Sequence, residues 1–241
     1  MSKIERIAVL GAGVIGASWT ALFLASGRSV VVYDPAPDAE TTVRAYIENA
    51  WPSLEELGAT QRATPDALRF VTNARDAVAE AEFVQENVPE RLPIKHNTYQ
   101  EIEPALGSNT VVSSSTSGLT LEALQEGWRD PRRLILGHPF NPPHLIPLVE
   151  LTANDRTDPS VLDATEAFYA DIGKVTIRIK KGMPGHVANR LQAAVWREVV
   201  HMAVEGVASI EDIDKAMWAG PGLRWAAMGP TMLFHLGAGD G

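Results

Sequence analysis

Two residues that can do acid–base chemistry, His138 and Glu150, stand at either end of a proline-rich segment midway along the chain. Apolar runs at residues 134–136 and 148–151 flank four prolines, which can neither continue a helix nor donate to a central sheet ladder. We therefore expect two strands joined by a rigid, irregular loop. A carboxylate beside a histidine fixes its tautomer and stabilises the imidazolium, so the pair can act as a general base. Taken alone, the same residues also fit a structural pair, and both interpretations stay open.

A glycine-rich turn, Gly11-Ala12-Gly13-Val14-Ile15-Gly16, opens the first predicted helix. A buried strand at residues 4–10 precedes it, a helix at 14–25 follows, and a second strand at 29–33 ends at Asp34. A strand, a helix and a strand with an acid about 20 residues after the glycines form the fingerprint of a dinucleotide-binding unit.

Each glycine in that turn has its own physical task. Gly11 makes the tight turn, Gly13 lets the backbone approach a pyrophosphate, and Gly16 lets helix and strand pack closely. The pyrophosphate would rest on the helix N-terminus, where Val14 and Ile15 complete the predicted cofactor-binding turn.

The acid at the end of the second strand indicates which dinucleotide binds. Asp34 would hold the adenosine ribose hydroxyls and would repel a 2′-phosphate. The next residues, Pro35-Ala36-Pro37, offer no arginine to receive one. The sequence therefore predicts NAD rather than NADP.

A cluster of hydroxyl residues, Ser113 to Ser117, follows another predicted strand, at residues 110–112. It fits a polar loop with an N-cap for a helix starting near Thr120. It also fits a ligand site, because ligands of open α/β sheets bind at the carboxyl ends of strands. The residues alone favour neither.

Composition narrows the function classes. The chain has 241 residues, 45% hydrophobic and 21% charged, with a net charge of −9 and no cysteine. The negative charge argues against nucleic acid or an anionic membrane as partner, and without cysteine there is no disulfide or thiolate metal site. We predict no metal site of any kind. No signal peptide or apolar run of membrane-spanning length is present, so we expect a cytoplasmic protein.

Strand and helix patterns alternate up to residue 183, and only helical patterns follow. We predict an α/β fold, in which a Rossmann-type, mostly parallel sheet domain (residues 1–183) precedes a smaller all-α C-terminal domain (184–241). An apolar residue recurs every four positions on a predicted helix at 184–205. Such apolar helices need a partner surface, which could be the sheet domain, further residues or a second subunit. We expect the helical domain to be partial.

Several motifs together resemble the 3-hydroxyacyl-CoA dehydrogenase superfamily. They are the glycine-rich turn, Ser115-Thr116-Ser117-Gly118-Leu119, His138-Pro-Phe-Asn141-Pro, Leu148-Val149-Glu150 and Pro184-Gly185-x-x-x-Asn189-Arg190-Leu191. Further stretches, such as Gln85-Glu86-x-Val88-Pro89-Glu90 and Gly222-Leu223-Arg224-Trp225, are most similar to the branch containing L-carnitine dehydrogenase and L-gulonate 3-dehydrogenase, which is related to lambda-crystallin.

The resemblance implies a role for each matching residue. His138 corresponds to the catalytic base and Glu150 to the acid that pairs with it, while Ser117 and Asn189 would hold the substrate oxygen. Glu86 and Asn87 would lie along the nicotinamide half of the cofactor, and Ser115 would also bind the cofactor. The family also implies a homodimer built from the C-terminal helices, and a small-molecule substrate.

One departure from the family bears on the substrate. Users of coenzyme A carry basic residues after the second strand, whereas here residues 35–64 are acidic and no lysine occurs between Lys3 and Lys95. We therefore expect oxidation of a small free 3-hydroxy acid, carnitine-like or gulonate-like. The alternatives are a 3-hydroxyacyl-CoA dehydrogenase of fatty acid metabolism and a catalytically silent NAD-binding structural protein.

Overall fold

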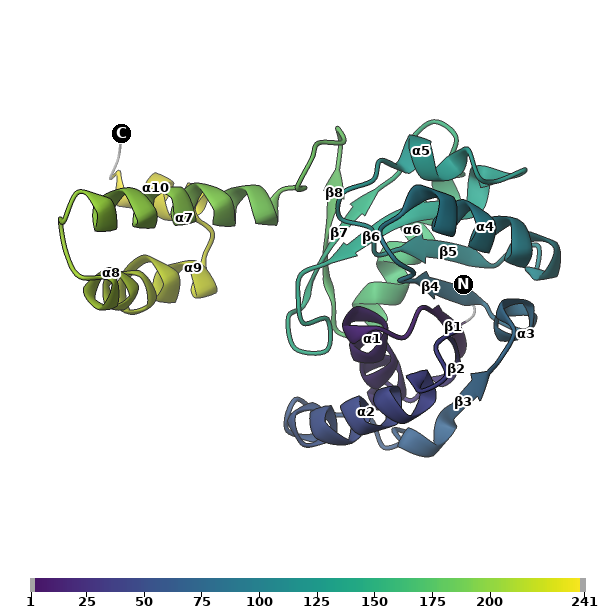
Figure 1. Ribbon diagram of the computed structural model, residues 1–241. Helices are drawn as coiled ribbons and strands as arrows, with labels where there is room; N and C mark the ends of the chain where they lie inside the picture. The colour runs from purple at the N-terminus through teal and green to yellow at the C-terminus, as the bar shows by residue number, and fades with distance from the viewer. Residues whose placement is uncertain (1–2, 239–241) are drawn as a thin grey trace. The chain divides into compact units, whose positions relative to one another are not determined.

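An eight-stranded sheet forms the centre of the first of two compact units in the computed structural model, which describes residues 3–238 (Figure 1). The first unit spans Met1–Val187 and the second Ala188–Gly241. The domain boundary predicted from the sequence lies between residues 183 and 184. Among residues 3–238, no helix is long and apolar enough to cross a membrane.

The sheet is mostly parallel, and the reversal comes at its sixth and seventh strands. Its strands lie in the order β3 (Leu68–Val71), β2 (Ser29–Tyr33), β1 (Arg6–Leu10), β4 (Phe83–Glu86), β5 (Val111–Ser114), β6 (Leu134–Pro139), β7 (Leu148–Thr152) and β8 (Val175–Ile179). All neighbours pair in parallel except β6 and β7, which pair antiparallel. This confirms the predicted Rossmann-type α/β fold.

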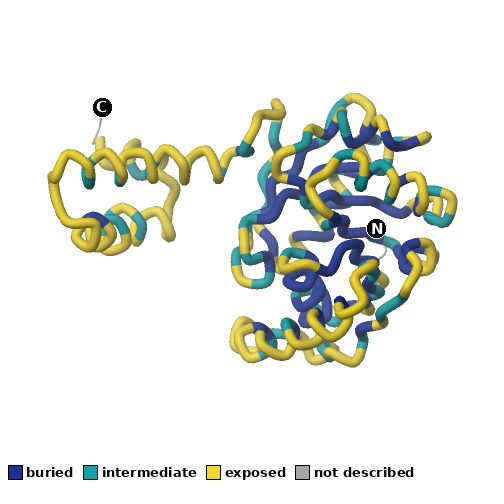
Figure 2. Tube along the Cα trace, in the orientation of Figure 1, coloured by how far each residue is buried: buried dark blue, intermediate teal, exposed yellow. Residues whose placement is uncertain are grey.

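Helices cover both faces of the sheet and make two separate apolar cores. One core includes α1 (Val14–Ala25), α2 (Ala39–Glu56) and α6 (Pro159–Asp171), and the other α3 (Ala74–Val78), α4 (Leu92–Ile102) and α5 (Leu121–Gln125). Short 3₁₀ turns at Pro65–Ala67, Glu103–Ala105 and Pro131–Arg133 precede strands β3, β5 and β6 in the chain. Figure 2 shows the central strands and α1 as almost continuously buried, which agrees with their apolar runs.

The second unit consists of helices alone. These are α7 (Ala188–Val204), α8 (Ile210–Met217), a π-helical segment (Trp218–Gly222), α9 (Leu223–Ala227) and α10 (Pro230–Gly237). Ser209 caps the N-terminus of α8, because its hydroxyl accepts a hydrogen bond from the Asp212 backbone N–H at 3.1 Å. The last residues of the sequence, 239–241, lie outside the described part of the chain.

The start of α7 differs from the prediction. The sequence pattern places the helix at 184–205, but α7 begins only at Ala188. Gly185 and His186 both have positive φ, 79° and 49°, which an α-helix cannot accommodate. The chain therefore turns sharply before the helix, and the periodicity of apolar residues carried no sign of this.

The antiparallel strands β6 and β7 set the positions of His138 and Glu150. In the β6–β7 ladder His138 lies directly opposite Glu150. The proline-rich loop joins the two strands, with a cis peptide bond between Asn141 and Pro142. Hydrogen bonds to Lys174 and Ser18 hold this loop in place. Lys174 Nζ donates to the carbonyls of Pro143 and Ile146, and the His144 backbone N–H donates to the Ser18 hydroxyl at 2.9 Å.

Gly137, next to His138, offers a test of this packing. A Cβ there would lie 2.2 Å from the Ser113 hydroxyl and 2.8 Å from the Tyr169 hydroxyl. Because both side chains are buried and bonded to each other, Gly137→Ala should lower the free energy of unfolding by about 1–3 kcal/mol. Thermal denaturation followed by circular dichroism measures this. Gly182→Ala is the matched control, since a Cβ there meets nothing within 4 Å. Equal melting temperatures for both variants would contradict the packing argument.

Candidate active site

The glycine-rich turn between β1 and α1 has the shape that a dinucleotide requires. Gly11 has φ +85°, and a Cβ there would lie 2.6 Å from the Asn87 backbone. A Cβ on Gly16 would lie 1.9 Å from the Gly11 carbonyl oxygen. A Cβ on Gly13 would meet nothing within 4 Å, so open space faces the uncapped N-terminus of α1. These features fit a pyrophosphate bound to the backbone N–H groups of the turn.

Asp34 is held rigidly where β2 ends. Its two carboxylate oxygens accept hydrogen bonds from the backbone N–H groups of Ala12, at 2.7 Å, and Ala36, at 2.9 Å. The acid is therefore tied to the glycine-rich turn itself. This position suits a group that receives ribose hydroxyls.

His138 and Glu150 form a buried pair at the same edge of the sheet. His138 Nδ1 lies 2.9 Å from Glu150 Oε2, and the two residues are 5% and 0% exposed. The other carboxylate oxygen accepts a hydrogen bond from the Val187 backbone N–H at 2.8 Å. With Nδ1–H donating to the carboxylate, Nε2 of the neutral ring is left as the basic nitrogen.

The hydroxyl cluster divides into structural and open members. Ser113 hydrogen-bonds to Tyr169, and the Ser114 hydroxyl donates to Glu86. Ser115 donates to Asn87 at 2.7 Å. Ser117, in contrast, is exposed and lines a pocket of about 420 Å³. The buried members of the cluster are structural, and the role of Ser117 in a ligand site stays a prediction.

Asn87 and Ser115 lie together beside the glycine-rich turn. The Asn87 backbone N–H donates to the Leu10 carbonyl at 2.7 Å, and its side-chain oxygen accepts from Ser115. The indole N–H of Trp19, on α1, also donates to the Ser115 hydroxyl, at 3.2 Å. Strands β1, β4 and β5 therefore bring three parts of the predicted cofactor site to one place.

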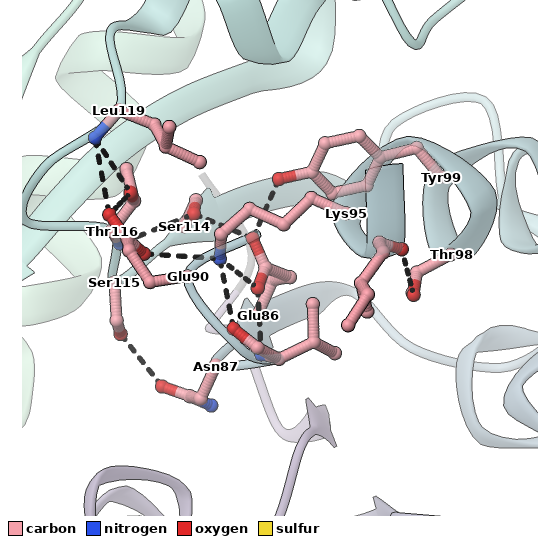
Figure 3. A network of polar contacts seen from close by, with 12 residues as sticks. Glu86, Asn87, Glu90, Lys95, Thr98, Tyr99, Ser114, Ser115, Thr116 and Leu119 are labelled. Carbon is pink, nitrogen blue, oxygen red and sulfur yellow. Dashed lines mark hydrogen bonds and ion pairs between the residues drawn. The ribbon is translucent and has the colours of Figure 1, made fainter. Parts of the chain in front are cut away.

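Glu86 has four donors of its own inside the fold (Figure 3). One oxygen accepts from the Val88 backbone N–H at 2.8 Å and from Lys95 Nζ at 2.7 Å, and the other accepts from the hydroxyls of Tyr99 and Ser114, both at 2.6 Å. All four contacts point into the protein, which favours a structural task for this carboxylate. Its role as a cofactor-binding residue stays a prediction.

Glu90 organises the loop that carries Ser117, and the sequence analysis did not single it out. Its Oε1 accepts hydrogen bonds from the backbone N–H groups of Ser117 and Gly118, at 3.1 and 2.7 Å. It also accepts from the Leu119 backbone N–H at 3.1 Å and from the Thr116 hydroxyl, as Figure 3 shows. Burial acts to raise the pKa of Glu90, but these hydrogen bonds and the nearby Lys95 ammonium outweigh it and hold the pKa below its ordinary value. A carboxylate four residues after Glu86, where strand β4 has ended, was the available signal.

His186 is the second residue that the sequence analysis missed. Its ring stacks on that of His138 with centroids 4.3 Å apart and planes 17° apart. Burial, and then the neighbouring His138, lower the pKa of His186 below its usual value, so this ring is neutral at pH 7. The Pro-Gly-His turn before α7 was the only trace of it in the sequence, because nothing there relates it to β6.

His144, Asn189 and two residues of α9 lie in other surroundings. His144 Nδ1 lies 2.8 Å from the Ser18 hydroxyl, which ties its ring to α1. Asn189 is the second residue of α7, and Arg224 and Trp225 lie on α9, all in the second compact unit. The part of Asn189 in the site stays a prediction.

Comparisons with known proteins agree with this geometry. Residues 6–182 match the model of the 3-hydroxyacyl-CoA dehydrogenase NAD-binding domain, and residues 185–241 match that of the C-terminal domain of the same family. Among curated proteins, the L-carnitine dehydrogenase of Nocardiopsis dassonvillei is 48% identical over 238 residues, covering 99% of this chain and 72% of that protein. The Pseudomonas putida L-carnitine dehydrogenase is 41% identical over 240 residues, covering 100% of this chain and 75% of that protein.

Two solved structures of dehydrogenases are also similar to this chain. The NAD⁺-dependent 5-formyl-3-hydroxy-2-methylpyridine 4-carboxylic acid 5-dehydrogenase has a TM-score of 0.89 at 35% identity, covering 97% of this chain and 76% of that one. The (S)-3-hydroxybutyryl-CoA dehydrogenase of Ralstonia eutropha has a TM-score of 0.79 at 26% identity, covering 91% and 78%. The chain belongs to the 3-hydroxyacyl-CoA dehydrogenase family and is an NAD-dependent 3-hydroxy acid dehydrogenase.

Proposed function

We propose that the protein oxidises the 3-hydroxyl of a small free 3-hydroxy acid, carnitine-like or gulonate-like, to the 3-oxo acid. The observation that carries this proposal is the buried His138–Glu150 pair, 2.9 Å apart, at the sheet edge where the glycine-rich turn also lies. A base beside a nicotinamide site is what oxidation of an alcohol needs.

In this mechanism His138 Nε2 takes the hydroxyl proton as a hydride leaves the carbinol carbon. Glu150 stabilises the resulting imidazolium through Nδ1, and Ser117 and Asn189 hold the substrate oxygen as a carbonyl forms. NAD, when bound, supplies the hydride acceptor. The glycine-rich turn, Asp34, Asn87 and Ser115 are the residues that would hold it.

Charge supports a free acid over a coenzyme A thioester. Helix α2 and its flanks carry exposed acids, namely Asp38, Glu40, Glu48, Glu55 and Glu56. The phosphates of coenzyme A would be repelled by such a surface. The curated L-carnitine dehydrogenases are also more similar to this chain than the 3-hydroxybutyryl-CoA dehydrogenase is, at 48% against 26% identity.

We also propose that the two domains have different roles and that the protein forms a homodimer. Residues 1–183 would bind NAD, and the helices of residues 184–241 would contribute to the substrate site and to dimerisation. Large apolar side chains of the second unit support this, since Trp196, Val204 and Phe234 are 64%, 77% and 77% exposed. A cytoplasmic location stays a prediction.

The substrate proposal predicts a rank order in a panel of acids. With NAD, L-carnitine or L-gulonate should give NADH at a higher kcat/KM than 3-hydroxybutyryl-CoA, measured by absorbance at the nicotinamide band. Faster turnover of the thioester would establish the coenzyme A alternative. Tight NADH binding without turnover of any 3-hydroxy acid would instead support a structural protein.

Removing the base should abolish most activity. His138→Ala is expected to lower kcat by about 10²–10⁴-fold, because proton transfer by a positioned side chain contributes on that scale. His201→Ala, at an exposed position on α7, is the histidine control and should keep its activity. Steady-state kinetics decide, and a His138→Ala protein with full kcat would refute the assigned role.

Asp34 should set the choice between NAD and NADP. Asp34→Asn keeps the shape but loses the charge, so the preference for NAD in kcat/KM should fall by about 10–100-fold, the scale of a charge-assisted hydrogen bond. Asp38→Asn, an exposed acid just before α2, is the matched control. An unchanged preference in Asp34→Asn would show that another group reads the ribose.

A further inference from the structure

We propose that His186 is a positioning residue of this active site, which fixes the plane of the His138 imidazole through its ring face. The inference rests on the proposed function, because it concerns the same base. The observation behind it is the stack of the two rings, with centroids 4.3 Å apart and an interplanar angle of 17°.

A hydrogen bond alone leaves the His138 ring one free motion. Glu150 fixes the position of Nδ1 at 2.9 Å, but the ring can still tilt about that contact. A flat partner on one face stops the tilt and so directs Nε2. With centroids 4.3 Å apart, the two rings are in van der Waals contact.

The backbone around His186 is built to hold this placement. His186 has φ 49°, a left-handed conformation that residues with a Cβ rarely adopt, directly after Gly185 at φ 79°. The Val187 N–H, one residue further on, donates to Glu150 Oε1 at 2.8 Å. One carboxylate therefore holds the base with one oxygen and the turn that supplies the stacked ring with the other.

Hydrogen bonding does not explain why His186 is buried here, whereas the contact of its ring face with His138 does. Its Nε2 is buried without a hydrogen-bond partner among the described residues. His186 is 6% exposed, and a buried nitrogen without a partner is unfavourable. A residue kept there at that cost acts through the contact it does make, which is the stack.

Charge explains why a neutral ring suits this place. The charged and titratable groups facing His186 are His138, Glu150 and Glu90. When His138 takes the substrate proton, a second imidazolium in the stack would repel it. A neutral ring instead presents its π face to the cation, a favourable contact. The low pKa of His186 keeps it in that neutral form.

Three variants separate the ring face from its nitrogens. His186→Ala removes both, His186→Phe keeps the flat ring, and His186→Gln keeps a polar group without an aromatic face. Using the acid of the panel that is oxidised fastest, we expect Ala and Gln to lower kcat about tenfold, the scale of one aromatic–cation contact, with little change in KM for NAD. Phe should restore kcat to within about threefold of the wild type.

A measurement independent of turnover accompanies the kinetics. In the NMR spectrum, the ring proton signals of His138 should lose their ring-current shift in His186→Ala and keep it in His186→Phe. NADH affinity and melting temperature check that each variant is folded, and if Ala fails to fold, the comparison of Phe with Gln decides.

Two outcomes overturn the inference. One is an unchanged kcat in His186→Ala, and the other is rescue by Gln rather than Phe, which would assign the role to a hydrogen bond. If His138→Ala is inactive while His186→Ala is fully active, the proposed function stands and this inference falls. If the wild type oxidises no 3-hydroxy acid, the proposed function fails, and the NMR comparison still tests the stack.

Discussion

The site depends on one buried carboxylate, that of Glu150, and on the need to satisfy its charge. A carboxylate with 0% exposure is costly unless its oxygens have partners. One oxygen meets the His138 ring and the other the Val187 N–H. Strand β6 and the turn before α7 are thereby drawn to the same side chain of β7. The arrangement needs the antiparallel β6–β7 ladder, which places residues 138 and 150 in register.

Two further carboxylates, those of Glu86 and Glu90, also accept hydrogen bonds from several parts of the chain. Glu86 gathers donors from α4 and β5, and Glu90 gathers the backbone N–H groups of the Ser117 loop. Lys95 lies between them, 2.7 Å from an oxygen of Glu86 and 3.8 Å from one of Glu90. The Ser117 loop lacks regular secondary structure, so the Glu90 carboxylate supplies hydrogen bonds that a helix or strand would have given its backbone.

The groups that contact the His138 ring, Glu150 and His186, also bear on its reactivity. In the proposed mechanism His138 changes charge during each turnover, and its neighbours act on that step. Glu150 contacts the edge of the His138 ring at Nδ1. His186, kept neutral by burial and by that neighbour, lies against its face without adding a competing charge. The Ser117 pocket, which His186 also lines, is therefore bordered by a ring that stays uncharged at neutral pH.

Sequence patterns alone predicted the sheet domain, the glycine-rich turn and the pairing of His138 with Glu150. These are local patterns, since apolar runs, turn glycines and a proline-rich loop each act over a few residues. Tertiary contacts were needed to show which hydroxyls of the Ser113–Ser117 cluster are structural, that Glu90 holds their loop, and that His186 stacks on His138. Those contacts join residues 26 to 56 positions apart through strand pairing and left-handed turns, which periodicity does not encode. The late start of α7 has the same cause, because the Glu150 carboxylate lies far from it in sequence yet binds the turn before it.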